Sequence, residues 1–156
     1  MFDGDELAGI VEQFGALSRA ELERAVEELA FKRGEAVEPG AVADRIEAAV
    51  EELRLVPVER EGTRLFAPGP TAFPALPAGA EDLPHILEVE ERAVDRAQLA
   101  RSAERRLREA AAAATAANDR ERMAALLDYT YDLETWAPED VAVESVRERL
   151  DAARSE

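Results

Sequence analysis

The side chains that could carry acid–base or metal chemistry are few, and their spacing assembles no site. His85 is the only histidine of the chain. Catalysis or metal binding needs several converging groups, so we expect a histidine that is hydrogen-bonded within its own segment. Its acidic neighbours are Glu81, Asp82 and Glu88. Asp128 and Asp132 are one helical turn apart and could share a hard cation with other oxygens, but a solvated helix face is the commoner outcome.

The sequence lacks the motifs that are typical of several large classes of enzyme. The chain has no cysteine, which excludes disulfides, thiol nucleophiles and cysteine-based zinc sites. Neither a G-x-G-x-x-G nor a P-loop pattern occurs, and no G-x-S-x-G signature is present. We therefore expect no catalytic residues, no cofactor and no metal site. A small hydrolase or metal-dependent enzyme built on His85 and nearby acids is the weakest alternative.

The arginines offer a different chemistry, because a guanidinium can bind a phosphate or a carboxylate. Acids outnumber bases in residues 44–64, which predicts a poor surface for DNA phosphates. Residues 92–122 carry eight arginines against five acids, although these arginines can also pair internally with Glu104 and Glu109. The candidate contacts to a nucleic acid or a partner protein are Arg45, Arg54, Arg60, Arg64, Arg101, Arg105 and Arg108.

The net charge is −16, with 35 Asp and Glu against 19 Lys and Arg, and Lys32 is the only lysine. Such an excess of negative charge destabilises a compact chain by self-repulsion unless salt screens it. At 1 M salt, charges separated by more than about 3 Å are largely screened from one another. The composition predicts a protein of a halophilic cytoplasm; an acidic protein from a GC-rich bacterium is the alternative. The chain starts with acidic residues and has no apolar run of about 18 residues, so we expect no signal peptide and no membrane contact.

Apolar stripes at helical spacing predict three helices before residue 54. The first covers residues 3–15, the second runs from Ser18 to about Arg33, and the third begins near Pro39. Capping boxes of S/D-x-x-E type start the first two helices. The period then changes: "LVPVER" and "RLFAP" predict two strands joined by a turn at Gly62, with Pro57 indicating an edge strand.

Three helices followed by a hairpin resemble a winged helix–turn–helix domain over residues 5–67, carried by "IVEQFGALSRAELERAV" and "VADRIEAAVEELRLVPVEREGTRLFAPGP". More narrowly, "FGALSRAELERAVEELAFKRG" and "PGPTAFPALPAGAEDLPHIL" resemble a family of small uncharacterised proteins from halophilic archaea. That resemblance covers most of the chain and implies no established activity. The winged-helix resemblance concerns the fold and fixes no function.

Residues 68–92, the proline-rich segment, hold five of the eight prolines. A free linker would be rich in Ser, Gly or charge, whereas this segment carries large apolar side chains, among them Phe73, Leu76, Leu83 and Leu87. Burying such side chains contributes roughly 1.5–3 kcal/mol each, which favours an extended strap laid on the helical core. An alternative is that the prolines and Phe73 form a groove or a docking peptide for a partner.

The remaining residues, 93–156, predict three helices packed with the first module. The first spans about 95–117, Asp119 caps the second, whose core stripe includes Tyr131, and Pro138 opens the third. The predicted fold is thus mainly α: a winged-helix-like module (residues 1–67), a strap (68–92) and a C-terminal helical region (93–156). Tyr129, Tyr131 and Trp136 are expected in the helix–helix core, or else in an aromatic patch that binds a partner.

These features predict a non-enzymatic interaction or regulatory module that binds another macromolecule, with a protein as the first choice of partner. The binding surface would be the winged-helix face or the C-terminal helices. The alternative is a winged-helix DNA-binding transcription regulator, with homodimerisation through the C-terminal helices.

Overall fold

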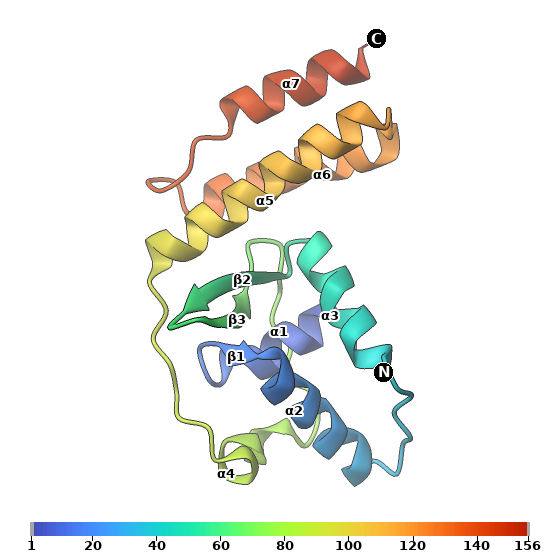
Figure 1. The fold of residues 1–156 in the computed structure, drawn as a ribbon, viewed down its shortest axis with the longest axis vertical. Helices are drawn as coiled ribbons and strands as arrows, with labels where there is room; N and C mark the ends of the chain where they lie inside the picture. The colour runs from blue at the N-terminus through green and yellow to red at the C-terminus, as the bar shows by residue number, and fades with distance from the viewer. Residues whose placement is uncertain (1, 156) are drawn as a thin grey trace. The chain divides into compact units, whose positions relative to one another are not determined.

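The computed structural model describes residues 2–155 and divides the chain into two compact units, Met1–Asp95 and Arg96–Glu156. Both units are mainly helical, and the first also contains a small antiparallel sheet (Figure 1). The mainly helical fold predicted from the sequence is confirmed at this level. The elements of the N-terminal unit are α1 (Gly4–Glu12), β1 (Leu17–Ser18), α2 (Arg19–Lys32), α3 (Ala41–Glu51), β2 (Leu55–Arg60), β3 (Thr63–Pro68), a 3-10 turn η1 (Ala80–Asp82) and α4 (Leu83–Leu87).

Both predicted capping boxes are present and set the starts of α1 and α2. The Asp3 carboxylate accepts from the Glu6 backbone N–H, and the Glu6 carboxylate accepts from the Asp3 N–H. Ser18 and Glu21 make the same reciprocal pair at α2. Each pair satisfies two backbone donors that a helix start would otherwise leave free.

The apolar stripes of α1, α2 and α3 meet in one core, as their spacing predicts. Helix α3 itself starts later than expected, because it begins at Ala41 and Pro39 stays outside it. The largest side chains that are almost completely buried in this core are Phe14, Phe66, Leu7, Ile10, Leu17, Leu22, Leu29, Ile46, Leu55 and Leu83. Burying each one removes it from water at a gain of roughly 1.5–3 kcal/mol.

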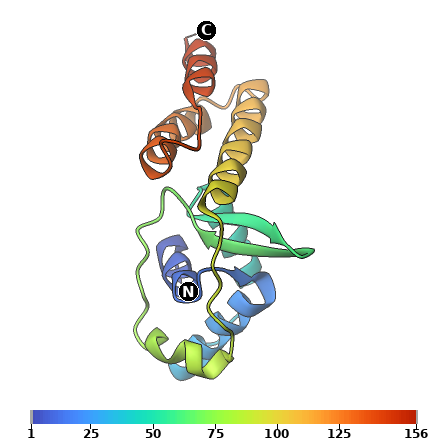
Figure 2. The same cartoon turned by 90° about the vertical axis from the view of Figure 1, so that its left-hand side faces the viewer.

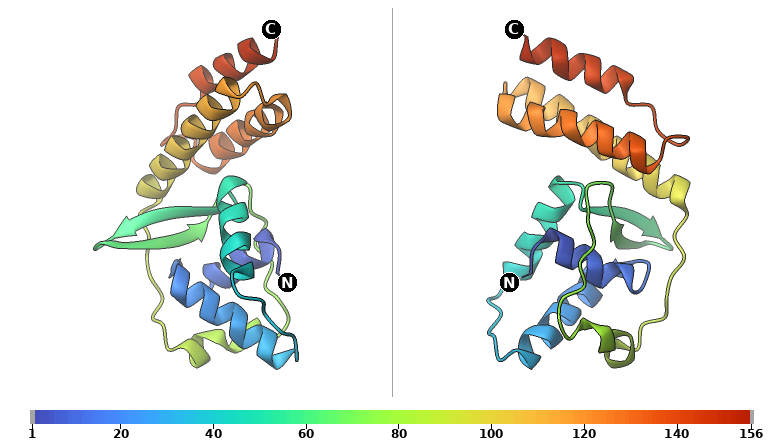
Figure 3. Two further views of the ribbon diagram at one scale, coloured as in Figure 1. Left: turned by 45° about the vertical axis from the view of Figure 1, so that its right-hand side comes forward. Right: turned by 180° about the vertical axis from the view of Figure 1, so that it is seen from behind.

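The hairpin forms where the sequence predicts it, and the sheet gains a strand that the sequence did not reveal. Strands β2 and β3 pair antiparallel from Leu55↔Pro68 to Arg60↔Thr63. The extra strand, β1, lies on the other side of β3, so the order is β1-β3-β2. Pro57 therefore lies on an edge strand, where a missing N–H does least harm. The hairpin projects away from the helices of this unit (Figure 3).

The proline-rich segment belongs to the N-terminal unit and folds back over α1 (Figures 2 and 3). Its second half is not extended, because it forms η1 and α4, which bury Ala80, Leu83 and Leu87 in the core. The strap interpretation favours burial of its large apolar side chains, but two of them stay at the surface. Phe73 is 80% exposed and Leu76 46% exposed.

The C-terminal unit contains α5 (Arg96–Ala116), α6 (Arg120–Trp136) and α7 (Glu144–Arg154). Helices α5 and α6 lie side by side, and α7 packs on both (Figure 1). Small residues line the buried face of α5 between Leu99 and Leu107, which lets its neighbours come close. None of the helices within residues 2–155 combines the length and the apolar character that crossing a bilayer requires.

Two details of this unit differ from expectation. Pro138 lies in a turn, and α7 begins at Glu144, so the proline does not open the last helix. Tyr131 is 55% exposed instead of lying in the core, where Thr130 and Leu133 are buried. The stripe of α6 keeps Met123 and Leu126, as expected, and continues with Thr130 and Leu133 in place of Tyr131.

Gly15 gives a test of how closely the proline-rich segment approaches β1. A Cβ on Gly15 would lie 1.9 Å from the Arg92 carbonyl oxygen, whereas a Cβ on Gly62 would meet nothing within 4 Å. Both glycines have φ +80, so Gly62→Ala isolates the cost of the left-handed conformation, about 1–2 kcal/mol. We expect Gly15→Ala to lower the free energy of unfolding by at least about 1 kcal/mol more than Gly62→Ala does, because the backbone at Arg92 must also shift. Urea denaturation of both variants measures this, and equal losses would contradict the close approach.

Candidate macromolecular interface

The outward face of α3 is the surface that a winged helix would present to DNA, and here it is acidic. Asp44, Arg45 and Glu47 are all exposed. Glu47 forms an ion pair with Arg19 of α2, so this guanidinium is already paired with a carboxylate of the same unit. Arg45 faces a shallow pocket of about 230 Å³ that is also lined by Asp3, Asp5, Glu52 and Arg54. Arg45 is thus the exposed cation of a face dominated by carboxylates.

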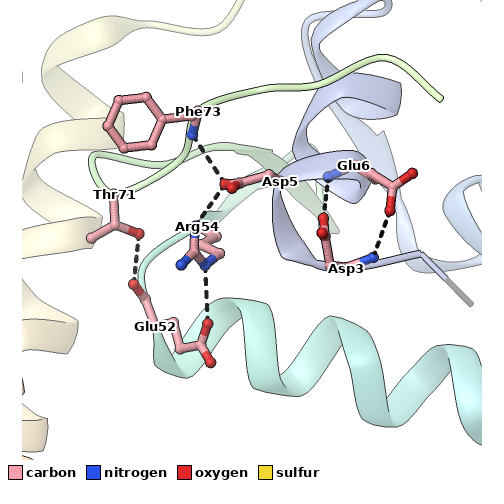
Figure 4. Close-up of polar contacts among 7 residues, drawn as sticks. All are labelled: Asp3, Asp5, Glu6, Glu52, Arg54, Thr71 and Phe73. Atoms are coloured by element: carbon pink, nitrogen blue, oxygen red, sulfur yellow. Dashed lines mark hydrogen bonds and ion pairs between the residues drawn. The ribbon is translucent and has the colours of Figure 1, made fainter.

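Arg54 is held in an internal cluster (Figure 4). Its Nη1 lies 2.6 Å from Asp5 Oδ1, and its Nε lies 3.0 Å from Glu52 Oε2. Burial lowers the pKa of Arg54, but its hydrogen bonds with the Glu52 and Asp5 carboxylates raise the pKa above the usual value. Thr71 Oγ1 donates to the Glu52 carbonyl at 2.7 Å. Arg54 therefore joins α1 to the end of α3, and its guanidinium, although partly exposed, is shared between two carboxylates.

The two arginines of the hairpin differ in their partners. Arg60 Nη1 donates to the Ala93 carbonyl at 2.9 Å, so its guanidinium reaches the end of the proline-rich segment. The Arg64 guanidinium carbon lies 5.3 Å from the centre of the Phe66 ring, on an exposed stretch of β3. A groove of about 600 Å³ lies between the hairpin and residues 88–93. Its charged lining is Glu21, Glu61, Glu88, Glu90, Glu91, Arg60 and Arg92.

Arg92 lines this groove and makes a two-point ion pair with Glu21, which also lines it. Its Nη1 and Nη2 lie 2.7 and 2.9 Å from the two Glu21 carboxylate oxygens, and Nη1 also donates to the Ala16 carbonyl at 3.0 Å. The hydrogen bond with Arg92 lowers the pKa of Glu21 to about 2, although partial burial opposes the shift. The Arg92 N–H donates to the Phe14 carbonyl at 2.7 Å. Arg92 thus fixes the proline-rich segment to the residues around β1.

The candidate arginines of the C-terminal unit also fall into two kinds. Arg101 and Arg105 are exposed on α5. Arg108 is committed to the unit itself: its guanidinium donates to Glu104, to the Ser145 hydroxyl at 3.2 Å and to the Ala142 carbonyl at 2.6 Å. The predicted pairing of this face with Glu104 is present at Arg108.

The residues that the sequence offers for acid–base or metal chemistry do not come together in one site. His85 is exposed on α4. Burial, followed by the charge of Asp128, raises the pKa of Asp132, as expected for two carboxylates on one helix face. Within residues 2–155, no three or more side chains of the His, Cys, Asp and Glu types come together as a metal site would require.

Sequence reasoning missed Arg147 of α7, whose side chain is only 16% exposed. Its guanidinium donates to Thr130 Oγ1 at 3.0 Å and to both carboxylate oxygens of Glu134, and it lies 4.0 Å from the centre of the Tyr131 ring. The contacts span 13 to 17 residues of sequence. Arg147 explains why Tyr131 stays at the surface, since the ring covers the guanidinium.

The Glu21–Arg92 pair predicts a pH dependence of stability. Because folding lowers the pKa of Glu21 from 4.5 to about 2, the pair's contribution is present above pH 4.5 and is lost as the pH falls toward 2. We expect Glu21→Gln to lower the free energy of unfolding at pH 7 and to flatten its fall between pH 4.5 and 2. Urea denaturation across this range measures it, with Glu23→Gln as control. A slope that Glu21→Gln leaves unchanged would contradict the pair.

Comparison with known proteins places the chain without assigning it an activity. Residues 5–155 match the model of a family of unknown function, DUF7109. The search of curated proteins and the search of solved structures give no match. The match extends through both units, from α1 to the end of α7, so the chain belongs to the DUF7109 family.

Proposed function

We propose that this protein is a non-enzymatic interaction module that binds a protein partner in a high-salt cytoplasm. The observation that carries the proposal is the use of arginine. Of the candidate contact residues, Arg54 and Arg108 are bound to carboxylates and carbonyls of their own units. The exposed face of α3 keeps Asp44 and Glu47 beside Arg45. A polyanion needs a basic footprint, so a protein is the better partner.

The N-terminal unit is proposed to be a winged-helix-like module. The element order α1, β1, α2, α3, β2, β3 and the sheet order β1-β3-β2 support this interpretation, because the hairpin follows α3 directly as a wing would. The proline-rich segment acts as a strap on this module. Burial of Leu83 and Leu87 and the Arg92–Glu21 ion pair support that role.

A DNA-binding regulator, homodimeric through its C-terminal helices, is the second candidate. One observation favours it: Arg45 and Arg64 are exposed on α3 and on the hairpin, the two elements that a winged helix uses to contact a duplex. A single guanidinium can read guanine without a broad basic surface. This candidate predicts a sequence preference at native salt.

A duplex-binding measurement separates the two candidates. We expect fluorescence anisotropy with a random-sequence 20-base-pair duplex to give no saturable binding at concentrations up to ~100 µM, near the weak end of ordinary non-specific affinities. The lowest KCl concentration that keeps the chain folded is the most demanding condition. Asp44→Arg combined with Glu61→Arg is the positive control, since it adds cations to α3 and to the hairpin turn. Saturable binding by the wild type that Arg45→Ala or Arg64→Ala weakens would establish the regulator instead.

The proposed high-salt setting predicts a salt requirement for folding. With a net charge of −16, the chain is expected to lose its structure in salt-free buffer and to fold cooperatively above about 1 M KCl, where screening acts within about 3 Å. Circular dichroism during KCl titration measures this. Replacing the exposed Glu27, Glu35 and Glu38 by Gln should lower the KCl concentration at the midpoint. Equal stability with and without salt would refute the halophilic setting.

A further inference from the structure

The structure exposes four large hydrophobic side chains within residues 2–155, and two of them lie three residues apart in the proline-rich segment. Residues 73–76, with the sequence Phe-Pro-Ala-Leu, are all exposed, and we name them the apolar ridge. We propose that the apolar ridge is a preformed docking peptide that inserts Phe73 and Leu76 into an apolar groove of a partner protein with a basic rim. This inference rests on the proposed function and assigns its contact surface.

The backbone of the apolar ridge is fixed on α1. The Phe73 N–H donates to Asp5 Oδ1 at 3.0 Å, and the Ala75 N–H donates to the Asp5 carbonyl at 3.0 Å. Gly9 lets the ridge lie against the helix, because a Cβ there would be 2.2 Å from the Ala75 carbonyl oxygen. The same Asp5 carboxylate binds Arg54, so the ion-pair cluster also holds the ridge (Figure 4).

The side chains of the ridge point where a partner could reach them. The Phe73 ring points away from the Asp5–Arg54 cluster, while its backbone nitrogen faces Asp5 (Figure 4). Phe73 and Leu76 each precede a proline, which favours extended backbone, and Pro74 and Pro77 fix φ near −65°. In a polyproline-like path of three residues per turn, positions 73 and 76 share one face. Pro77 is buried and anchors the end of the ridge.

Holding apolar side chains rigid and exposed is the opposite of what stability favours. A flexible loop would let Phe73 collapse onto the surface, and a polar residue would avoid the hydration cost. A rigid recognition segment, by contrast, has already lost the backbone entropy that binding would otherwise remove. Apolar contacts also suit concentrated salt, because screening weakens charge pairs without weakening burial. The two backbone hydrogen bonds to Asp5 hold the ridge in place while Phe73 and Leu76 stay exposed, and binding to a partner would remove this apolar surface from water.

The charges around the ridge specify the partner. Figure 4 shows four carboxylates near Phe73 and one guanidinium: they belong to Asp3, Asp5, Glu6, Glu52 and Arg54. A second guanidinium, that of Arg45, lines the pocket beside Asp3, Asp5 and Glu52. Arg54 is shared between two carboxylates, so the surround of the ridge remains acidic. A second copy of this chain would bring a second acidic surround against the first, which opposes self-association. An apolar groove with arginine or lysine at its rim matches both features.

Photocrosslinking tests the ridge with a matched control from the same chain. Full-length protein carrying p-benzoylphenylalanine at position 73 is irradiated with extract of its source cells at the native salt concentration. Position 31 is the control, because Phe31 is 83% exposed and Phe73 80%, while Phe31 lies on α2 outside the ridge. We expect one discrete protein adduct at position 73 that position 31 does not give. Mass spectrometry then maps the crosslinked residue to an apolar groove flanked by arginine or lysine.

The adduct must be followed by affinity measurements with the purified partner. We expect Phe73→Ser and Leu76→Ser each to weaken binding about tenfold or more, as truncation of an interface anchor does, and Phe31→Ser to leave it unchanged. Gly9→Ala, which displaces the ridge without changing its side chains, should also weaken binding. Circular dichroism confirms that each variant is folded at the same salt concentration.

The outcomes separate the apolar ridge from the proposed function. A protein partner whose affinity is unchanged by Phe73→Ser and Leu76→Ser rejects the ridge and leaves the docking function standing. A crosslinked homodimer, or the same adducts at positions 73 and 31, likewise rejects the ridge. Retention of duplex DNA with no protein adduct rejects both the ridge and the docking function.

Discussion

Within each unit of this protein, arginine side chains connect elements that are distant in sequence. Arg54 joins α1 to the end of α3, and Arg92 joins the proline-rich segment to α2 and to the residues before β1. In the C-terminal unit, Arg147 binds α6 from α7. With 19 basic residues against 35 acidic ones, each guanidinium placed inside is one fewer at the surface. Arg54, Arg92 and Arg147 thus use their guanidinium groups for contacts within their own units.

The apolar ridge follows from this arrangement. Asp5 uses its carboxylate for Arg54 and for the Phe73 N–H, and its carbonyl for the Ala75 N–H. One residue of α1 therefore determines both the ion-pair cluster and the path of the chain beside it. Because the backbone of residues 73–76 is bound on the side of α1, their side chains are left on the outer side. The exposure of Phe73 is thus a consequence of the hydrogen bonding and not of a loose loop.

Local signals in the sequence predicted local structure well, whereas contacts between residues that are distant in sequence could not be predicted. The capping boxes at Asp3 and Ser18, the Gly62 turn and the start of α6 after Asp119 depend on residues within a few positions of each other, and all are confirmed. Strand β1 has two residues and no alternating pattern; it exists because β3 offers an edge. The sequence left both burial of Phe73 and its docking to a partner open, since hydrophobicity alone does not reveal that Asp5 binds the backbone at Phe73. Nothing local marks Arg92 or Arg147, whose partners lie 71 and 13 to 17 residues away.

Concentrated salt would act very differently on the contacts inside this protein and on contacts with a polyanion. Screening at 1 M acts over about 3 Å, and the bridges of Arg54 and Arg92 span 2.6–3.0 Å between atoms that are only partly exposed. Such bridges keep most of their hydrogen-bond energy when longer-range attraction to phosphates is lost. Apolar burial is unaffected by screening. Arg54 and Arg92 thus use their guanidinium groups in short-range bridges within their own unit, while Phe73 and Leu76 stay exposed, and short-range bridges and apolar contacts are the kinds that concentrated salt weakens least.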